Sequence, residues 1–310
     1  MPKPDTHRAH LLRRITWEDL SPEYLRQLIG LAREEDLEGR GLKVQPVNTG
    51  DATTALMPEG QTGAARLVAR ESMTLCGLPL IPMILESYGS GVIFAARSSG
   101  GDKLRRGDCI GELSGPVSVI LQAERVMLNF LQRLSGVATA TSAFVAMLGE
   151  SGPKLLDTRK TTPGYRMLEK WAVATGGGWN HRLGLFDRIM LKDNHLAASG
   201  KSAGERLSEA VRAARASRPD LAVEVEVDSI EQIPPVLEAG ADVIMLDNFS
   251  LEETEEALKL IGDKSWTELS GGITEETVPE LARLGVDFIS TGAVVHRSRW
   301  VDIGLDWCNE

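Results

Sequence analysis

The chain has 310 residues, 42% hydrophobic and 25% charged residues and a formal net charge of -10, so it can bury a substantial core in one or two domains. Its 34 Lys and Arg against 44 Asp and Glu argue against a general nucleic-acid surface, which would show a basic excess. The three cysteines, Cys76, Cys109 and Cys308, fit neither a disulfide framework nor a zinc site and are expected to be reduced and structural.

The amino terminus, from Met1 to about Thr16, is polar and is expected to be loose. It lacks the apolar core of a signal peptide, and no stretch approaches the roughly 18 apolar residues of a membrane span, so we expect a cytoplasmic protein. Ser21 and Pro22 predict the start of a helix that runs to about Glu35. The Gly-rich segment from Leu37 to Gly50 predicts a loop.

A small α+β domain is predicted next. Short β runs at Ala64 to Ala69, Val92 to Ala96 and Cys109 to Leu113 surround one helical stretch near Pro82 to Leu85. Ser98 to Asp102 could be taken for a phosphate loop, but the residues after it favour a turn between strands.

A helix is predicted from Gly115-Pro116 to about Leu134, with apolar residues on more than one stripe. Such a helix must be buried on several sides, by the other domain or by another subunit. Arg125 within it requires an anionic partner. The residues alone leave open whether that partner is a structural salt bridge or a ligand.

From Lys154 onward the pattern alternates between strand and helix. Apolar strands are predicted near residues 154 to 157, 188 to 192, 221 to 227, 242 to 247, 266 to 269 and 286 to 290, with helical runs at 202 to 216, 230 to 238, 252 to 260 and 275 to 283. Six β/α steps favour a parallel, barrel-like sheet.

A positive cluster lies between Leu155 and His195 of this acidic chain. Its cations are Arg159, Lys160, Arg166, Lys170, Arg182, Arg188 and Lys192, with His181 and His195 beside them. Three groups follow strands or glycines, namely Arg159-Lys160, His181-Arg182 and Lys192, and they indicate a site for a multiply charged anion. Arg166, Lys170 and Arg188 are interpreted more simply as solvated charges on a helix face.

The predicted strand ends form one chemical face. They carry Asp157, Arg159, Lys160, Lys192, Glu226, Asp247, Ser270-Gly271-Gly272 and Ser290-Thr291-Gly292. The two Gly-containing loops, with helix starts expected at Thr274 and Ala293, are typical of phosphate binding. Glu226 and Asp247 follow apolar runs and should face the pocket, where they at least neutralise the cations.

Several ordered motifs in this region resemble the quinolinate phosphoribosyltransferase family. They are DTRKTTPG, EK-x-AV-x-x-GGG-x-NHR-x-GL-x-D and LKDNH, with further matches at Glu124-Arg125, Leu134-Ser135-Gly136, Val223 to Glu226, Leu246-Asp247-Asn248, Ser270 to Gly272 and Ser290 to Gly292. They span roughly Gly115 to Gly292, which is far more specific than one short motif. The chain departs from the family pattern at Tyr165, at Trp179 and in its long early loop.

The resemblance implies an incomplete α/β barrel, over residues 125-296, preceded by an open α+β sandwich domain over 1-124. The tail, 297-310, would pack on that first domain. It also implies a decarboxylating transfer of phosphoribosyl from phosphoribosyl pyrophosphate to quinolinate, which gives nicotinate mononucleotide, pyrophosphate and CO₂ in NAD biosynthesis.

The resemblance further implies the site residues. Quinolinate carboxylates would be held by Arg125, Arg159, His181, Arg182 and Lys192, with Lys160 also near pyrophosphate. Glu226 and Asp247 would hold ribose hydroxyls and Mg²⁺ bound to the substrate phosphates. Lys160, Glu226 and Asp247 are the expected catalytic residues, and Arg125 would enter the neighbouring subunit of a homodimer.

Two nucleotide-binding motifs are excluded by the residues. A P-loop at Gly200-Lys201-Ser202 fails because the motif requires glycine at position 195, which is His195. A Rossmann loop at Gly176 to Gly178 fails on spacing. A related phosphoribosyltransferase for another aromatic acid, and a catalytically silent metabolite binder, stay open.

Overall fold

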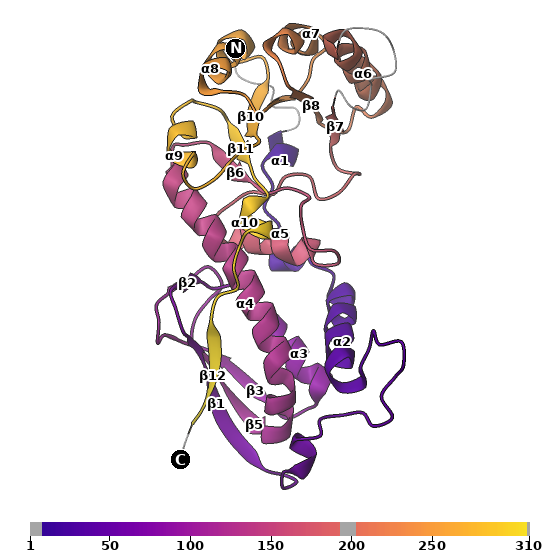
Figure 1. The fold of residues 1–310 in the computed structure, drawn as a ribbon, viewed down its shortest axis with the longest axis vertical. Helices are drawn as coiled ribbons and strands as arrows, with labels where there is room; N and C mark the ends of the chain where they lie inside the picture. The colour runs from indigo at the N-terminus through magenta and orange to yellow at the C-terminus, as the bar shows by residue number, and fades with distance from the viewer. Residues whose placement is uncertain (1–7, 193–202, 309–310) are drawn as a thin grey trace. The chain divides into compact units, whose positions relative to one another are not determined.

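The computed structural model describes residues 8–192 and 203–308 and divides into two compact units (Figure 1). Unit 1 comprises Met1–Arg14, Thr141–Thr162 and Gly177–Arg297, and unit 2 comprises Ile15–Ala140, Pro163–Gly176 and Ser298–Glu310. One continuous helix, α4 (Val117–Leu148), contains both the expected boundary after residue 124 and the division after Ala140.

Unit 2 is built on an antiparallel sheet with the strand order β12-β1-β5-β3. The strands are Ile303–Trp307, Thr62–Ala69, Cys109–Pro116 and Ile93–Ala96, in that order, and the short strands β2 (Met73–Thr74) and β4 (Lys103–Leu104) pair separately. Its other elements are α2 (Pro22–Glu38), α3 (Leu80–Tyr88), α5 (Arg166–Thr175) and the 3-10 turns η1 (Trp17–Asp19) and η2 (Thr54–Leu56). The predicted α+β character of this part is confirmed.

The start of α2 follows from its sequence. Ser21 Oγ accepts the N–H of Tyr24 at 3.2 Å, and Pro22 occupies the first turn, where its missing N–H costs nothing. The helix ends at Gly39, whose φ of 69° suits a residue without Cβ.

Helix α4 is longer than the predicted end near Leu134. The helix continues through Gly136. A Cβ at this position would lie 2.1 Å from the carbonyl oxygen of Arg299, so the glycine is needed for close packing and does not mark a helix end. The glycine therefore serves a close backbone contact in unit 2. Arg125 on this helix is solvent-exposed, and no ion pair joins it to a residue that the structure describes.

Unit 1 contains a six-stranded parallel sheet in the order β6-β11-β10-β9-β8-β7. These strands are Lys154–Leu156, Phe288–Ser290, Trp266–Ser270, Val243–Asp247, Val223–Val227 and Ile189–Leu191. The end strands β6 and β7 do not pair with each other in the described part of the chain, so the barrel is incomplete, as predicted.

Short helices accompany these strands. They are α1 (Arg8–Leu11), α6 (Ala203–Ser217), the 3-10 turn η4 (Ile230–Gln232), α7 (Ile233–Glu238), α8 (Leu251–Ile261), α9 (Val278–Leu281) and α10 (Ala293–His296). The expected helix start at Ala293 is confirmed. The start expected at Thr274 is wrong, because residues 274 to 277 form a turn in which Thr274 N–H bonds to Thr277 Oγ1 at 3.0 Å.

The barrel interior is built in layers. One end is closed by the buried apolar side chains of Leu11, Leu156, Ala222, Val243 and Phe288. Because successive side chains of a strand face opposite ways, every second residue beyond this layer returns to the interior. The last interior positions of the strands lie at their carboxyl ends, where the candidate site is found.

Two charges predicted to be solvated are buried instead. Arg188 is 2% exposed and pairs with Glu224 inside the barrel, while Lys170 on α5 is fully buried in unit 2. A single charged residue between apolar ones does not reveal a partner that lies far along the chain. Among the described residues, no helix has both the length and the apolar character needed to cross a membrane.

Candidate active site

A cavity of about 720 Å³ opens at the carboxyl ends of the parallel strands in unit 1. It is lined by Thr158, Arg159, Lys160, His181, Arg182, Met190, Lys192, Glu226, Met245, Asp247, Asn248, Ser270, Gly271, Gly272 and Ser290. Eleven of these fifteen residues are ones that the sequence singled out. Residues from the ends of all six parallel strands therefore share one pocket.

The loop after β6 supplies cations to one wall. Arg159 has a buried Nε without a hydrogen-bond partner in the described chain, so its guanidinium retains donor capacity for a ligand. Burial, together with repulsion from Arg159, lowers the pKa of Arg182 from its ordinary value. The pocket thus concentrates positive charges that repel each other until an anion binds between them.

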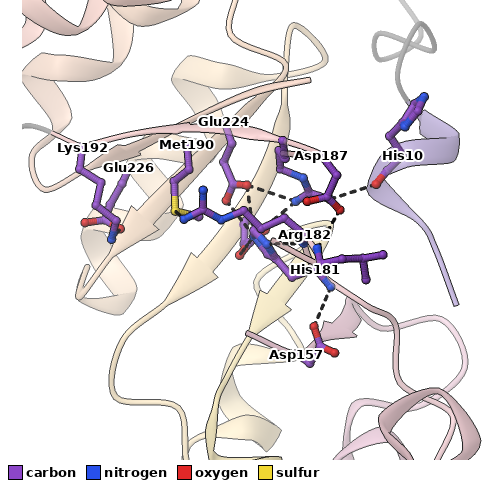
Figure 2. Close-up of polar contacts among 12 residues, drawn as sticks. His10, Asp157, His181, Arg182, Asp187, Met190, Lys192, Glu224 and Glu226 are labelled. Atoms are coloured by element: carbon purple, nitrogen blue, oxygen red, sulfur yellow. Dashed lines mark hydrogen bonds and ion pairs between the residues drawn. The ribbon is translucent and has the colours of Figure 1, made fainter. Parts of the chain in front are cut away.

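Asp157 holds the loop that carries the next two site residues. Its carboxylate is fully buried, and it accepts the Asn180 side-chain amide and the His181 N–H, each at 2.8 Å. His181 Nδ1 accepts the N–H of Arg182 at 2.7 Å (Figure 2). Arg182 Nη2 then reaches Met190 Sδ at 3.4 Å, which directs the guanidinium along the cavity wall.

Two carboxylates face the cations from neighbouring strands β8 and β9. Glu226 forms an ion pair with Lys192, which follows β7 (Figure 2). Asp247 accepts the Asn248 side-chain amide at 3.0 Å. Asn248 holds a left-handed φ of 57°, and its own N–H bonds to Ser270 O at 3.0 Å. This strained residue links the Asp247 strand end to the glycine loop after β10.

A smaller cavity of about 150 Å³ adjoins the first around the two glycine loops. Thr291 and Gly292 line it, together with Lys160, His296 and Arg297. A Cβ on Gly292 would lie 3.0 Å from Lys160 Cδ and 2.9 Å from His296 Cδ2, so only glycine leaves this concavity open. Burial and the charges of Lys160 and Arg297 lower the pKa of His296.

The structure brings thirteen of the fourteen predicted site residues to these two cavities. Arg125 is the exception, since it lies on α4 in unit 2 and lines neither cavity. His195, noted in the positive cluster, lies outside the described residues. Sequence reasoning missed Met190, Met245, Asn248, His296 and Arg297 as lining residues. Met245 and Met190 could have been predicted, because side chains two residues apart on a strand face the same side and Asp247 and Lys192 were already assigned to the site.

An α/β barrel whose strand ends combine cations, two carboxylates and glycine loops defines an enzyme site for polyanionic substrates. Two family models match the chain: the N-terminal domain of quinolinate phosphoribosyl transferase at residues 51–135 and its C-terminal domain at 137–306. The chain belongs to the quinolinate phosphoribosyl transferase family.

Named relatives agree with that assignment. A probable nicotinate-nucleotide pyrophosphorylase (carboxylating) of Bacillus subtilis is 41% identical over 264 residues, which cover 85% of this chain and 90% of the relative. The Mycobacterium leprae enzyme is 39% identical over 82% of this chain and 89% of its own length. A solved nicotinate-nucleotide pyrophosphorylase of Francisella tularensis matches with a TM-score of 0.85 at 34% identity, over 96% of this chain and 100% of that one.

Proposed function

We propose that this chain transfers phosphoribosyl from phosphoribosyl pyrophosphate to quinolinate with decarboxylation, giving nicotinate mononucleotide, pyrophosphate and CO₂ for NAD biosynthesis. The observation that carries the proposal is the single cavity in which cations, two carboxylates and glycine loops meet. Family membership and the names of relatives at 39% and 41% identity support it.

Quinolinate, a pyridine dicarboxylate, suits the cationic wall. Arg159 and Arg182 offer planar guanidinium forks that match carboxylates in a bidentate way, and Lys192 adds a point charge. His181 lines the same cavity, and its Nδ1 accepts the N–H of Arg182. The apolar side chains of Met190 and Met245 line the same cavity and can contact the pyridine ring.

Phosphoribosyl pyrophosphate suits the remaining surface. The backbone N–H groups of the loops at Ser270 to Gly272 and Ser290 to Gly292 can approach phosphate closely, and Lys160 lies between the two cavities. Glu226 and Asp247 can accept hydrogen bonds from ribose hydroxyls.

Mg²⁺ fits the same two carboxylates. Their oxygen donors come from adjacent strand ends within one cavity, and Mg²⁺ commonly uses one or two protein carboxylates together with substrate phosphates. Glu226 and Asp247 would hold the ion, and its chemistry would be to offset the charge of the pyrophosphate group.

The reaction asks the protein to place two polyanions and to stabilise moving charge. When the bond from ribose to pyrophosphate breaks, positive charge develops on the ribose, near Glu226 and Asp247, while Lys160 faces the departing phosphates. The pyridine nitrogen then bonds to the ribose carbon. The resulting pyridinium takes up the electron pair released as the adjacent carboxylate leaves as CO₂, and a proton replaces that carboxylate on the ring.

We further propose a homodimer in which Arg125 completes the neighbouring subunit's site. Arg125 is solvent-exposed on a helix that is otherwise largely apolar, and the described residues give it no ion pair. An exposed arginine that forms no ion pair with any described residue is available to a carboxylate bound elsewhere.

The test is turnover of quinolinate and phosphoribosyl pyrophosphate, followed as release of CO₂. We expect activity that requires both substrates and Mg²⁺ and that survives the surface change Lys264→Ala. Binding of both substrates, seen as a rise in melting temperature without turnover, would instead identify a silent metabolite binder. Turnover with another aromatic acid in place of quinolinate would identify a related phosphoribosyltransferase.

A further inference from the structure

A buried polar layer lies inside the barrel, between the apolar layer that closes one end and the pocket at the other. Its members are Glu224 on β8, Glu268 on β10, His181 and Arg188, which are 0%, 0%, 5% and 2% exposed. Period-2 alternation places Glu224 one interior position below Glu226, and Glu268 one below Ser270. Burying ionisable groups costs folding free energy unless they are paired, so these four residues are expected to interact with one another or to serve the site.

Both carboxyl groups approach one ring nitrogen of His181. Nε2 lies 3.2 and 3.1 Å from the two oxygens of Glu224 (Figure 2). It also lies 3.4 Å from Oε1 of Glu268. Arg188 Nη1 bonds to Glu224 Oε2 at 3.1 Å, and Arg188 Nη2 bonds to the carbonyl of His10 at 3.2 Å. Neither oxygen of Glu268 has a hydrogen bond within the described residues.

The other ring nitrogen fixes the tautomer. Nδ1 lies 2.7 Å from the main-chain nitrogen of Arg182, and a peptide N–H can only donate. Nδ1 must therefore supply a lone pair, which leaves the ring proton on Nε2. That proton points at Glu224 and Glu268. Arg188 Nη1, which can only donate, lies 3.3 Å from the same nitrogen and bonds to Glu224 Oε2 at 3.1 Å instead.

This assignment separates the layer from a metal centre. His181, Glu224 and Glu268 do have ligand atoms close enough to surround a cation. However, a metal on Nε2 would displace the proton that faces the two carboxylates, and Arg188 already balances the charge of Glu224. The groups are arranged to hold a proton on His181.

Electrostatics agree with the geometry for Glu224. Burial opposes its ionisation, yet the Arg188 guanidinium and the hydrogen bond from His181 favour the carboxylate and hold the pKa of Glu224 below its ordinary value. Glu224 is therefore an ionised acceptor at neutral pH. Glu268, on the other side of β9, adds a second carboxyl group 3.4 Å from Nε2. A ring turned by 180° would place carbon atoms against these carboxyl oxygens.

We infer that Glu224 and Glu268 are positioning residues for the quinolinate pocket: they hold His181 with its proton on Nε2, so that Nδ1 fixes the Arg182 main chain and the guanidinium faces the substrate. The inference rests on the proposed function for its substrate. It adds two buried residues, which touch neither substrate, to the machinery of the reaction.

The first experiment reads the tautomer directly in the unmodified chain. The sequence has five histidines, so ¹⁵N-histidine spectra at neutral pH can be assigned by comparison with His181→Asn. We expect one histidine with a protonated Nε2 and a bare Nδ1, and we expect Glu224→Gln to shift its signals. A proton on Nδ1 of His181 in the ligand-free protein would overturn the inference whether or not the chain proves to be active.

The second experiment separates positioning from folding by kinetics. Glu224→Gln should raise the KM for quinolinate by about tenfold or more and leave the KM for phosphoribosyl pyrophosphate within about twofold, as for outer partners of a binding group. Glu256→Gln, an exposed change on α8, is the matched control and should alter neither. An equal rise in both KM values would contradict a specific role in positioning the quinolinate pocket. If Glu224→Gln does not fold, the same two KM values are measured for Glu268→Gln.

The third comparison uses two replacements of the ring. His181→Asn keeps an acceptor at the position of Nδ1, whereas His181→Gln keeps a polar group only at the position of Nε2. We expect His181→Asn to bind quinolinate more tightly than His181→Gln in calorimetric titrations. The reverse order of affinities would overturn the inference. Absence of turnover in the unmodified chain would reject the proposed function, but the two quinolinate affinities could still be compared, because calorimetry does not require turnover.

Discussion

The ion pair between Lys192 and Glu226 predicts competition inside the ligand-free pocket. Lys192 is proposed to bind a quinolinate carboxylate, yet in the ligand-free structure its ammonium is paired with Glu226. Quinolinate must therefore break this pair, unless another cation takes over the carboxylate first. Removing the carboxylate by Glu226→Gln should free Lys192 and tighten quinolinate binding, even though Glu226 belongs to the active site.

The size of this effect follows from the exposure of the pair. The side chains are 35% and 19% exposed, so solvent screens the attraction and a value near that of a surface pair applies. We take about 1 kcal/mol, which corresponds to a roughly fivefold change in the Kd of quinolinate. A fully buried pair would have led us to expect a larger change.

Isothermal titration of quinolinate, without phosphoribosyl pyrophosphate, measures the effect. Asp247→Asn is the matched control, because it removes a carboxylate from the same cavity that bonds to Asn248 and not to Lys192. If Glu226→Gln and Asp247→Asn tighten binding equally, general charge repulsion is the cause and the reasoning is refuted. In a Lys192→Met background the Glu226→Gln effect should vanish, since additivity fails only for groups that interact.

Three further predictions concern neighbouring parts of the site. Lys160→Ala and Arg182→Ala should each lower kcat/KM by at least about tenfold with little loss of stability, because the cations repel each other without ligand; near-wild-type turnover would reject their roles. Gly271→Ala should destabilise the chain by about 1–3 kcal/mol, because its Cβ would lie 2.1 Å from the side-chain oxygen of Asn248. Gly272→Ala should destabilise it less, because a Cβ there meets nothing within 4 Å. Equal unfolding midpoints of the two variants would contradict this. Because the pKa of Glu224 is lowered to about 2, its ionised form stabilises the fold above its ordinary pKa of roughly 4.3, and this stabilisation is lost as pH falls toward the lowered value. The difference in unfolding free energy between the unmodified chain and Glu224→Gln should therefore be constant above about pH 5 and decrease below it.

The barrel could be predicted because its signal is local. In VEVEV, each glutamate of β8 alternates with a valine that packs outward, and the same period places Met245 and Asp247 on one face of β9. The pocket followed from the rule that parallel strands carry their chemistry at the carboxyl ends. Both inferences use residues within five positions of each other.

What could not be predicted depends on partners far along the chain. Arg188 was interpreted as solvated because its partner Glu224 lies 36 residues away, on another strand. The length of α4 was missed because the sequence gives no sign that Gly136 meets the Arg299 backbone 163 residues later. A lone histidine such as His296 carries no motif, and only the fold brings it to Gly292. Long-range pairing, rather than propensity, decides all three.

The role of Arg125 is the prediction that reaches beyond a single chain. We propose that it serves the neighbouring subunit, because it is exposed and its own chain offers it no ion pair among the described residues. The test mixes Arg125→Ala subunits with Lys160→Ala subunits after dissociation, so that random reassociation makes half of the dimers mixed. A mixed dimer then has one site with both lesions and one with neither, so activity should return to roughly a quarter of wild type if the two-fold related sites are independent.

The control is the pair Lys160→Ala and Arg182→Ala, whose two residues line one cavity of the same unit. Subunits carrying these changes should not complement each other, because every site in their mixed dimers keeps one lesion. If Arg125 acted within its own chain, the Arg125→Ala and Lys160→Ala mixture would behave in the same way, and no activity would return. Absence of recovery in mixed dimers of demonstrated composition would therefore reject the shared site, and it would leave the chemistry of the Lys160 pocket unaffected.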